Sequence, residues 1–319
     1  MSNGDIIEAT ARRVAAGRLA GLKIEEARVS AILDVTGLDQ RAREALERAL
    51  RAALSETGVS DVRVALTAGR VARTTIAVAS GKGGVGKSTL AANLAVALSR
   101  GGRRVGMVDA DIYGPSQPRL FAVEGTKPVA HEKRLVPVQT PAGVPLLSMG
   151  QLVAPDQAIA WRGPMTAGAL SQLMDADWGF ADTLVVDMPP GTGDVQLTLI
   201  QKHRPTGAVI VSTPQDLALI DARRAIDLFV KAGVPIIGLV ENMAGYACPH
   251  CGEISDPFGA GGAEAAAAEL GVPFLGRVPL AMAIRAASDD GTLAEAGAFT
   301  DIAARVAGWI DGESGAAER

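Results

Sequence analysis

The chain has 319 residues, of which 48% are hydrophobic and 21% charged, and its formal net charge at pH 7 is -4. One hydrophobic core rarely supports this length, so we expect one large domain and one small one. The mildly acidic balance and the lack of any apolar run near the roughly 18 residues of a spanning helix argue against nucleic-acid and membrane partners, and the polar N-terminus predicts a cytoplasmic protein.

Residues 1–70 are predicted to form a small α/β domain. Apolar residues at three- and four-residue spacing indicate helices over 6–20 and 40–54. Short apolar runs indicate strands over 27–35 and 62–66. This segment contains no cysteine, and we assign it no chemistry.

A second domain, residues 72–319, is predicted to be a doubly wound α/β fold. Its short apolar runs are continuous rather than alternating, which indicates a mostly parallel sheet covered by helices on both faces. Ligands of such sheets bind at the carboxyl ends of the strands. The predicted strands are 74–79, 104–108, 144–149, 183–187, 208–213, 235–240 and 273–277.

A glycine-rich segment follows the first of these strands and precedes a predicted helix. Its sequence, GKGGVGKST, fits the phosphate-binding template G-x-x-x-x-G-K-[ST], in which backbone N–H groups turn toward phosphate oxygens. We expect Lys87 to contact the β- and γ-phosphates of a nucleoside triphosphate, and the Ser88 hydroxyl to bind Mg²⁺. The predicted nucleotide-binding residues are Gly81, Lys82, Gly83, Gly84, Val85, Gly86, Lys87, Ser88 and Thr89.

Acidic residues stand at the ends of two predicted strands. Asp187 is expected beside the Mg²⁺ held by Ser88, and the loop 188–194 (MPPGTGD) combines rigid prolines with permissive glycines, as suits a γ-phosphate-sensitive switch. Asp109 and Asp111 follow another strand, and Asp109 is expected to support the metal. The chain lacks the guanine signature N-K-x-D, so ATP is favoured over GTP.

Cys248 and Cys251 form a C-x-x-C pair in a stretch that is predicted to be a loop. A redox couple needs a helix start at the first cysteine, which Pro257 disfavours, although redox or incidental thiols stay open as alternatives. A closed zinc site or an iron–sulfur cluster usually takes four ligands, and the chain has two cysteines. Metal ligation therefore requires a second subunit on a two-fold axis, with zinc bound also by His250 as an alternative.

An additional lysine, Lys82, makes the glycine-rich segment resemble the deviant Walker A motif of the MinD/ParA/nitrogenase-reductase class of P-loop ATPases. This resemblance implies that Lys82 crosses a dimer interface and is catalytic in trans on the partner's nucleotide, whereas Lys87 acts on the nucleotide of its own subunit. It also implies that Asp111 orients the attacking water and that Asn242 recognises the adenine edge. Because no arginine finger adjoins these motifs, a lone subunit is expected to turn over slowly.

Residues 74–310 resemble the Mrp/ApbC family of iron–sulfur cluster carriers. The family implies a homodimer that holds a labile [4Fe-4S] cluster between its two Cys248–Cys251 pairs, receives it from an assembly scaffold and delivers it to apo iron–sulfur proteins, with ATP hydrolysis. Residues 1–70 loosely resemble the small iron–sulfur-assembly domain that often precedes this ATPase. The resemblance rests on the segments 81–89, 109–116 (DADIYGPS), 161–165 (WRGPM), 187–194, 241–243 (ENM) and 248–251 (CPHC).

Rival functions stay open from the residues alone. A ParA/MinD-like positioning ATPase needs a basic surface or a basic amphipathic C-terminal helix, whereas residues 303–319 carry one arginine before an acidic tail. A nitrogenase-reductase-like electron donor is not expected to use a C-x-x-C pair, and an ATPase with a structural zinc is the third rival. Within the WRGPM segment, Arg162 is a candidate interface group, and packing of Trp161 beside a tight turn is the simpler interpretation.

Overall fold

The computed structural model describes residues 3–25, 28–38, 40–67, 73–131, 134–152, 163–191, 193–294 and 297–317. It divides into two compact units, of which one comprises Met1–Ala72 with Trp178–Ala181 and the other comprises Arg73–Asp177 with Asp182–Arg319. Among the described residues, no helix is long and apolar enough to cross a membrane.

The small unit packs two helices against one face of a three-stranded sheet of order β1-β2-β3. Strands β1 and β2 are antiparallel, whereas β2 and β3 are parallel. Alternate residues of β2, namely Val29, Ala31 and Leu33, are buried against apolar residues of both helices. The elements are α1 (Asn3–Ala15), β1 (Leu19–Glu25), β2 (Arg28–Asp34), α2 (Gln40–Ser55) and β3 (Asp61–Thr67).

The helix predicted over 6–20 is wrong beyond Ala15. Ala16 and Gly17 have φ values of 47° and 83°, in the left-handed region that ends a helix. The chain then enters β1, a strand that the sequence analysis missed because its side chains are mostly half-buried or exposed and show no clear alternation.

The large unit is built on a seven-stranded sheet of order β14-β11-β10-β4-β9-β5-β8, in which every neighbouring pair is parallel. All residues of β5, β9 and β10 are buried, as the continuous apolar runs predict. The predicted doubly wound α/β fold is therefore confirmed. The strands are β4 (Thr74–Ala79), β5 (Val105–Asp109), β8 (Leu146–Ser148), β9 (Thr183–Asp187), β10 (Gly207–Ser212), β11 (Ile236–Asn242) and β14 (Phe274–Val278).

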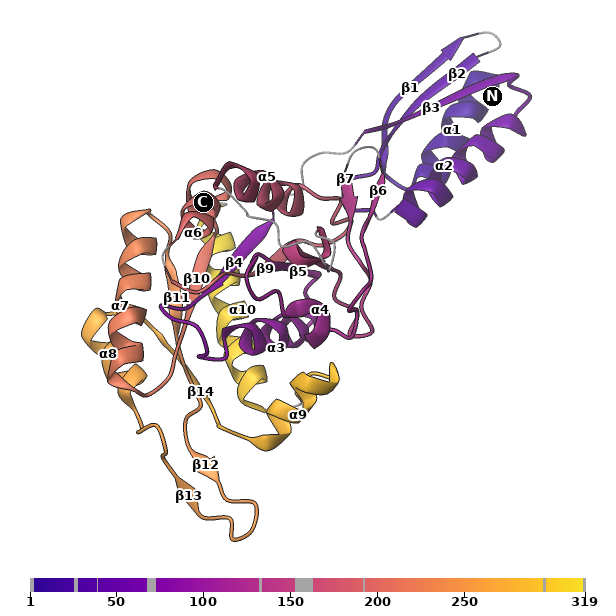
Figure 1. The fold of residues 1–319 in the computed structure, drawn as a ribbon. Coiled ribbons are helices and arrows are strands. Elements are labelled where there is room, and N and C mark those ends of the chain that lie inside the picture. Colours follow the sequence, from indigo (N-terminus) through magenta and orange to yellow (C-terminus); the bar gives the residue numbers. More distant parts are fainter. Residues whose placement is uncertain are drawn as a thin grey trace. The chain divides into compact units, whose positions relative to one another are not determined.

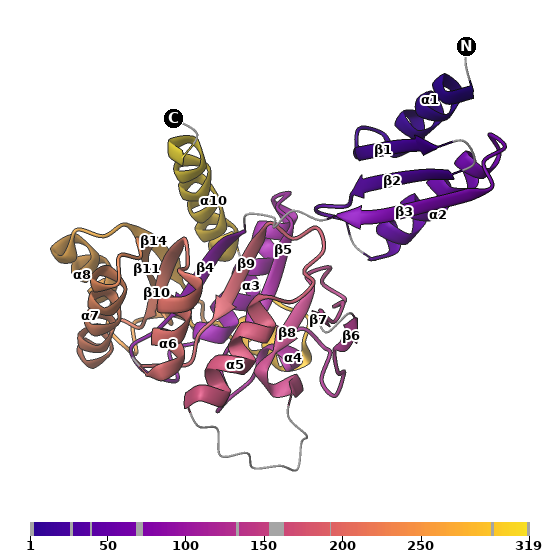
Figure 2. The ribbon, with the colours of Figure 1, turned by 90° about the horizontal axis from the view of Figure 1, so that it is seen from above.

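Helices cover both faces of this sheet. Figure 2 shows α3 and α10 together on one face and α5, α6 and α7 on the other. Of the remaining helices, α8 contacts α7, and α4 contacts α3 and α9. The helices are α3 (Lys87–Arg100), α4 (Gln117–Leu120), α5 (Gly163–Met174), α6 (Asp194–Thr198), α7 (Asp216–Lys231), α8 (Gly262–Leu270), α9 (Met282–Asp290) and α10 (Gly297–Ala317), with one-turn segments η1 (Met149–Leu152) and η2 (Leu199–His203).

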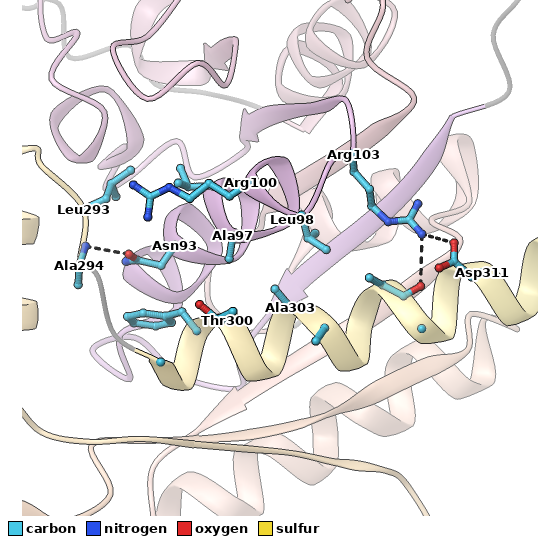
Figure 3. A pocket seen from close by; sticks show the side chains of 17 residues that line it. Asn93, Ala97, Leu98, Arg100, Arg103, Leu293, Ala294, Thr300, Ala303 and Asp311 are labelled. Carbon is cyan, nitrogen blue, oxygen red and sulfur yellow. Dashed lines mark hydrogen bonds and ion pairs between the residues drawn. The ribbon is translucent and has the colours of Figure 1, made fainter.

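Helices α10 and α3 contact each other, and residues of both line a groove of about 850 Å³ (Figure 3). The buried Asn93 of α3 donates to the carbonyl oxygen of Thr89 at 2.8 Å and accepts the N–H of Ala294 at 2.9 Å. At the other end of α3, Arg103 forms an ion pair with Asp311. These contacts tie the C-terminal helix to the helix that begins at the phosphate loop.

Two hairpins interrupt the alternation of strands and helices. Strands β6 (Val129–His131) and β7 (Arg134–Val136) form one, and β12 (Tyr246–Ala247) and β13 (Ile254–Ser255) form the other. Figure 1 shows the β12–β13 hairpin extending beyond the carboxyl end of β11. The sequence analysis predicted a loop there, because strands of two residues have no readable periodicity.

Candidate functional site

The glycine-rich loop joins β4 to α3 and surrounds a cavity of about 220 Å³. Gly86 has a φ of 79°, and a Cβ atom there would lie 2.1 Å from the Nδ2 atom of Asn242. A Cβ atom on Gly81 would lie 2.1 Å from the main-chain carbonyl of Asp221. Glycine is therefore required at both positions. The cavity is lined by Ser80, Lys82, Gly83, Gly84, Gly86, Lys87, Ser88, Thr89, Asp111 and Pro190.

Lys87 and Asp187 form a buried ion pair at this cavity. The lysine side chain is 6% exposed, and the carboxylate at the end of β9 is fully buried. The Lys87 ammonium also lies 3.4 Å from the Ser88 hydroxyl. A buried charge that lacks a partner of opposite sign is unfavourable. The ion pair therefore holds Lys87 at the carboxyl edge of the sheet.

Asp109 lies beside Asp187, because the register of the parallel strands β5 and β9 pairs the two residues. Its buried carboxylate accepts the Ser148 hydroxyl at 2.9 Å and the backbone N–H groups of Asp111 and Gln117 at 3.1 and 3.2 Å. Burial, together with the charge of Asp187, raises the pKa of Asp109 to about 8, and the three hydrogen bonds oppose this rise.

Gln117 is a site residue that the sequence analysis missed. It is the first residue of α4 and is fully buried. Its amide nitrogen donates to Oδ2 of Asp187 at 2.7 Å and to the main-chain oxygen of Ser88 at 3.0 Å. The sequence carries no signal for this role, because it depends on pairing with residues 29 and 70 positions away.

The oxygen atoms gathered here fit Mg²⁺. The Ser88 hydroxyl and the carboxylates of Asp109 and Asp187 are hard oxygen donors, which Mg²⁺ prefers. Among the described residues, the amide oxygen of Gln117 is buried beside them without a hydrogen-bond partner. Ser88 and Asp187 would hold the ion directly.

Asp111 is fixed at the cavity by backbone hydrogen bonds. Its Oδ1 atom accepts the N–H groups of Tyr113 and Gly114, each at 3.1 Å. Its side chain is 7% exposed and lines the same cavity as Lys82, which lies in the glycine-rich loop. The structure therefore brings the predicted residues of the loop, Asp109, Asp111 and Asp187 to one edge of the sheet.

Asn242, at the end of β11, touches the glycine-rich loop. Its Nδ2 atom donates to the main-chain oxygen of Val85 at 2.7 Å. The next residue, Met243, has a φ of 60°, which is uncommon for a residue with a side chain, and its methyl group would lie 3.8 Å from a Cβ atom on Gly86. The segment that leads to the cysteine hairpin therefore contacts the glycine-rich loop. The role of Asn242 in adenine recognition stays a prediction.

Cys248 and Cys251 lie in the turn between β12 and β13. The N–H of Cys248 donates to the carbonyl of Glu253 at 2.9 Å, and the N–H of Gly252 donates back to Cys248 at 2.8 Å. Hydrogen bonds from the backbone N–H groups of Cys251 and His250, and then from the Cys251 side chain, lower the pKa of the Cys248 thiol. This turn favours the thiolate, which is the form that binds metal.

The cysteine pair is not joined by a third candidate ligand in the part of the chain that the structure describes. Within the described ranges, no three His, Cys, Asp or Glu side chains are placed to hold a metal ion. His250 therefore does not form a three-ligand zinc site with the two cysteines. Two sulfurs on an exposed turn are an incomplete metal site.

Glu241 anchors both ends of the segment that carries the hairpin. Its fully buried carboxylate accepts the N–H groups of Gly261 and Ala263, at 3.3 and 2.8 Å, where α8 begins. It also accepts Nε of Arg277, on β14, at 3.0 Å. Since Glu241 is itself on β11, one carboxylate joins the start and the end of residues 242–262.

Residues 71–307 match the ParA family, described as NUBPL iron-transfer P-loop NTPases. The chain belongs to this family. Family membership agrees with the resemblance drawn from the motifs, and it accounts for the glycine-rich loop and the buried acids as the core of a P-loop NTPase.

Two relatives illustrate the likeness. An iron-sulfur cluster carrier protein of Pseudomonas fragi is 54% identical over 219 residues, which are 68% of this chain and 76% of that protein. An iron-sulfur protein required for NADH dehydrogenase, from Arabidopsis thaliana mitochondria, is 52% identical over 68% of this chain and 69% of that protein.

Solved structures show the same architecture. A nucleotide-binding protein from Archaeoglobus fulgidus in complex with ADP superposes with a TM-score of 0.61 and 40% identity, covering 70% of this chain and 88% of that one. The cell division ATPase MinD of Pyrococcus furiosus has a TM-score of 0.55 at 24% identity, covering 74% and 99%, and supports the fold alone. Of the motif residues predicted from sequence, Trp161, Arg162 and Thr192 lie outside the described residues.

Replacing Lys87 by alanine tests the nucleotide site. We expect Lys87→Ala to abolish ADP binding and to lower the free energy of unfolding by about 3–5 kcal/mol, because Asp187 is left buried without its partner. Lys231→Ala is the control, since this exposed lysine pairs only with Asp227 one helical turn away. Calorimetric titration with ADP and urea unfolding measure both effects, and an unchanged ADP affinity in Lys87→Ala would contradict the assignment.

Proposed function

We propose that this protein is an ATP-dependent iron–sulfur cluster carrier, which binds a labile [4Fe-4S] cluster at a homodimer interface and transfers it to apo-proteins. One observation carries the proposal. A P-loop with its acids is connected to an incomplete two-cysteine site through the end of β11, where Asn242 contacts the loop and Glu241 binds the start of α8 beyond the hairpin. The iron–sulfur carrier names of relatives about 50% identical support it.

ATP hydrolysis is supported by the positions of the charged groups around the cavity. The Lys87 ammonium is placed to neutralise phosphate oxygens, and backbone N–H groups of the loop add further donors. When bound, Mg²⁺ supplies positive charge to the phosphates, and Ser88 and Asp187 would hold it. Asp111, whose carboxylate is fixed at the cavity, orients the attacking water and accepts its hydrogen bond.

Lys82 is proposed to act on the nucleotide of the partner subunit. It lines the cavity at the same mouth as Gly83 and Gly84, which are exposed. A second copy facing this mouth would bring its own Lys82 toward the phosphates. A lone subunit lacks this second lysine, so dimer formation controls turnover.

The cluster is the cargo, and its ligand number sets the assembly. Cys248 and Cys251 supply two thiolates, whereas a cubane cluster takes four. Two copies related by a two-fold axis therefore complete the site. Separation of the copies removes half of the ligands at once, which suits a carrier that receives a cluster from an assembly scaffold and releases it to an apo iron–sulfur protein.

Cluster binding is tested by removing either sulfur. Anaerobic reconstitution with iron and sulfide should give one [4Fe-4S] cluster per two chains and visible absorbance, and Cys248→Ala or Cys251→Ala should lose both the cluster and its transfer to an apo-enzyme. Retained ADP affinity shows that each variant is folded. A wild-type protein that stays colourless and binds zinc, or a cluster on a lone subunit, would refute the carrier function.

Catalysis in trans by Lys82 is tested by mixing inactive variants. Lys82→Ala should keep its ATP affinity but lose about 10³-fold in turnover, the order of an arginine finger's contribution. Lys87→Ala should be inactive because it cannot bind ATP. An equal mixture should recover about a quarter of wild-type turnover, because half of the dimers then hold one complete site. No recovery on mixing would mean that Lys82 acts, if at all, within its own subunit.

Coupling between the two sites is tested at Glu241. In the wild type, ATP should change the alkylation rate of Cys248 and Cys251, because nucleotide contacts reach the hairpin through Asn242 and Glu241. Glu241→Gln weakens the hold on Arg277 and the start of α8, so the ATP effect should shrink while ATP affinity is retained. Glu264→Gln is the matched control, since Glu264 pairs with the same arginine from the surface. An equal ATP effect in both variants would disprove the coupling.

A further inference from the structure

Gln117 occupies the centre of the buried polar groups behind the phosphate loop. Its backbone N–H donates to Asp109, and its side-chain amide nitrogen donates to Asp187 and to the main-chain oxygen of Ser88. One fully buried residue therefore touches all three residues whose oxygens fit Mg²⁺. Nothing in the residue type or its spacing in the sequence marks it as functional.

The orientation of the Gln117 amide follows from its neighbours. The Asp187 carboxylate and the Ser88 carbonyl are both acceptors, so the amide nitrogen and not the oxygen must face them. The amide oxygen, Oε1, is consequently the end of the amide that does not bond to these two groups. It is buried and, among the described residues, it accepts no hydrogen bond.

A buried amide oxygen without a donor is unfavourable, and a water molecule or ion that enters the site is one explanation. Nucleotide phosphates cannot serve, because phosphate oxygens are acceptors. Water molecules bound to Mg²⁺ can, because Mg²⁺ keeps several waters when carboxylates and phosphates bind it, and those waters donate hydrogen bonds outward. The chemistry of the unpaired atom thus matches the hydration shell of the ion.

We propose that Gln117 is a positioning residue of the magnesium site. Its amide nitrogen holds Asp187 and the Ser88 backbone in place, and Oε1 accepts a hydrogen bond from a water molecule bound to Mg²⁺. This inference rests on the proposed nucleotide site and adds a residue to it. The backbone N–H of Gln117, which binds Asp109, tethers the start of α4 whatever side chain is present, so side-chain variants separate the two roles.

The experiment measures how strongly Mg²⁺ tightens ADP binding. ADP is titrated calorimetrically into the full-length protein in EDTA and in excess Mg²⁺, and the ratio of the two dissociation constants is the Mg²⁺ effect. Gln117→Met has a similar volume but no amide, so ADP binding should weaken more in Mg²⁺ than in EDTA. The Mg²⁺ effect should fall about tenfold, the size expected for one hydrogen bond to a charged group.

A control variant makes the result specific. Gln151→Met is the matched control, because Gln151 is also a buried glutamine but bonds only the N–H of Ser148 and the carbonyl of Thr126. It should retain the full effect. If Gln117→Met does not fold, Gln117→Asn, whose shorter side chain cannot span the same partners, replaces it.

Two results would overturn the proposal. Equal weakening of ADP binding in EDTA and in Mg²⁺ would mean that Gln117 only supports the fold, and an undiminished Mg²⁺ effect in Gln117→Met would mean that Oε1 does not contact the hydration shell. Failure of the wild-type protein to bind ADP at all would instead reject the nucleotide site itself, so the two failures are distinguishable.

Discussion

Two carboxylates placed side by side inside the sheet, Asp109 and Asp187, are the constraint on which the nucleotide site depends. Parallel pairing of β5 and β9 puts them in register, and burial removes both from water. Like charges at this separation are costly in a medium of low polarity. Lys87 forms an ion pair with Asp187, and the pKa of Asp109 is raised to about 8. The site is therefore prepared to accept positive charge.

The surrounding polar groups follow from the same constraint. Ser148 donates to Asp109, while Gln117 donates to both acids, and both residues are fully buried. Buried polar networks of this kind are favourable only when their members are hydrogen-bonded, so replacing any of these side chains leaves a buried polar group without a partner. Among the described residues, the amide oxygen of Gln117 is the acceptor of this network that has no hydrogen-bond partner, which points toward a ligand.

The cysteine turn is connected to this site by covalent continuity and by two side chains. Asn242 contacts the glycine-rich loop, and the adjacent Glu241 binds the start of α8, on the far side of the hairpin. These contacts link the loop to both ends of the segment that carries the hairpin. The turn favours the thiolate of Cys248, and the segment that carries it is held at both ends.

The sequence by itself determined the sheet and the phosphate loop, because continuous apolar runs and a short template are local properties. Strand β9 and the loop before α3 were predicted at the positions where they occur. The sequence-based prediction was wrong at the end of α1, where Ala16 and Gly17 adopt left-handed conformations that end the helix. It also missed β1, because the apolar residues of this strand show no clear period.

Only the tertiary structure revealed the roles of Gln117 and Glu241. Each acts on residues that are distant along the chain and adjacent only after parallel strands align in register. A glutamine or a glutamate has no spacing signature for such a role. Local sequence therefore predicted the groups of the nucleotide site, whereas the packing of the sheet decided which buried groups hold them in place.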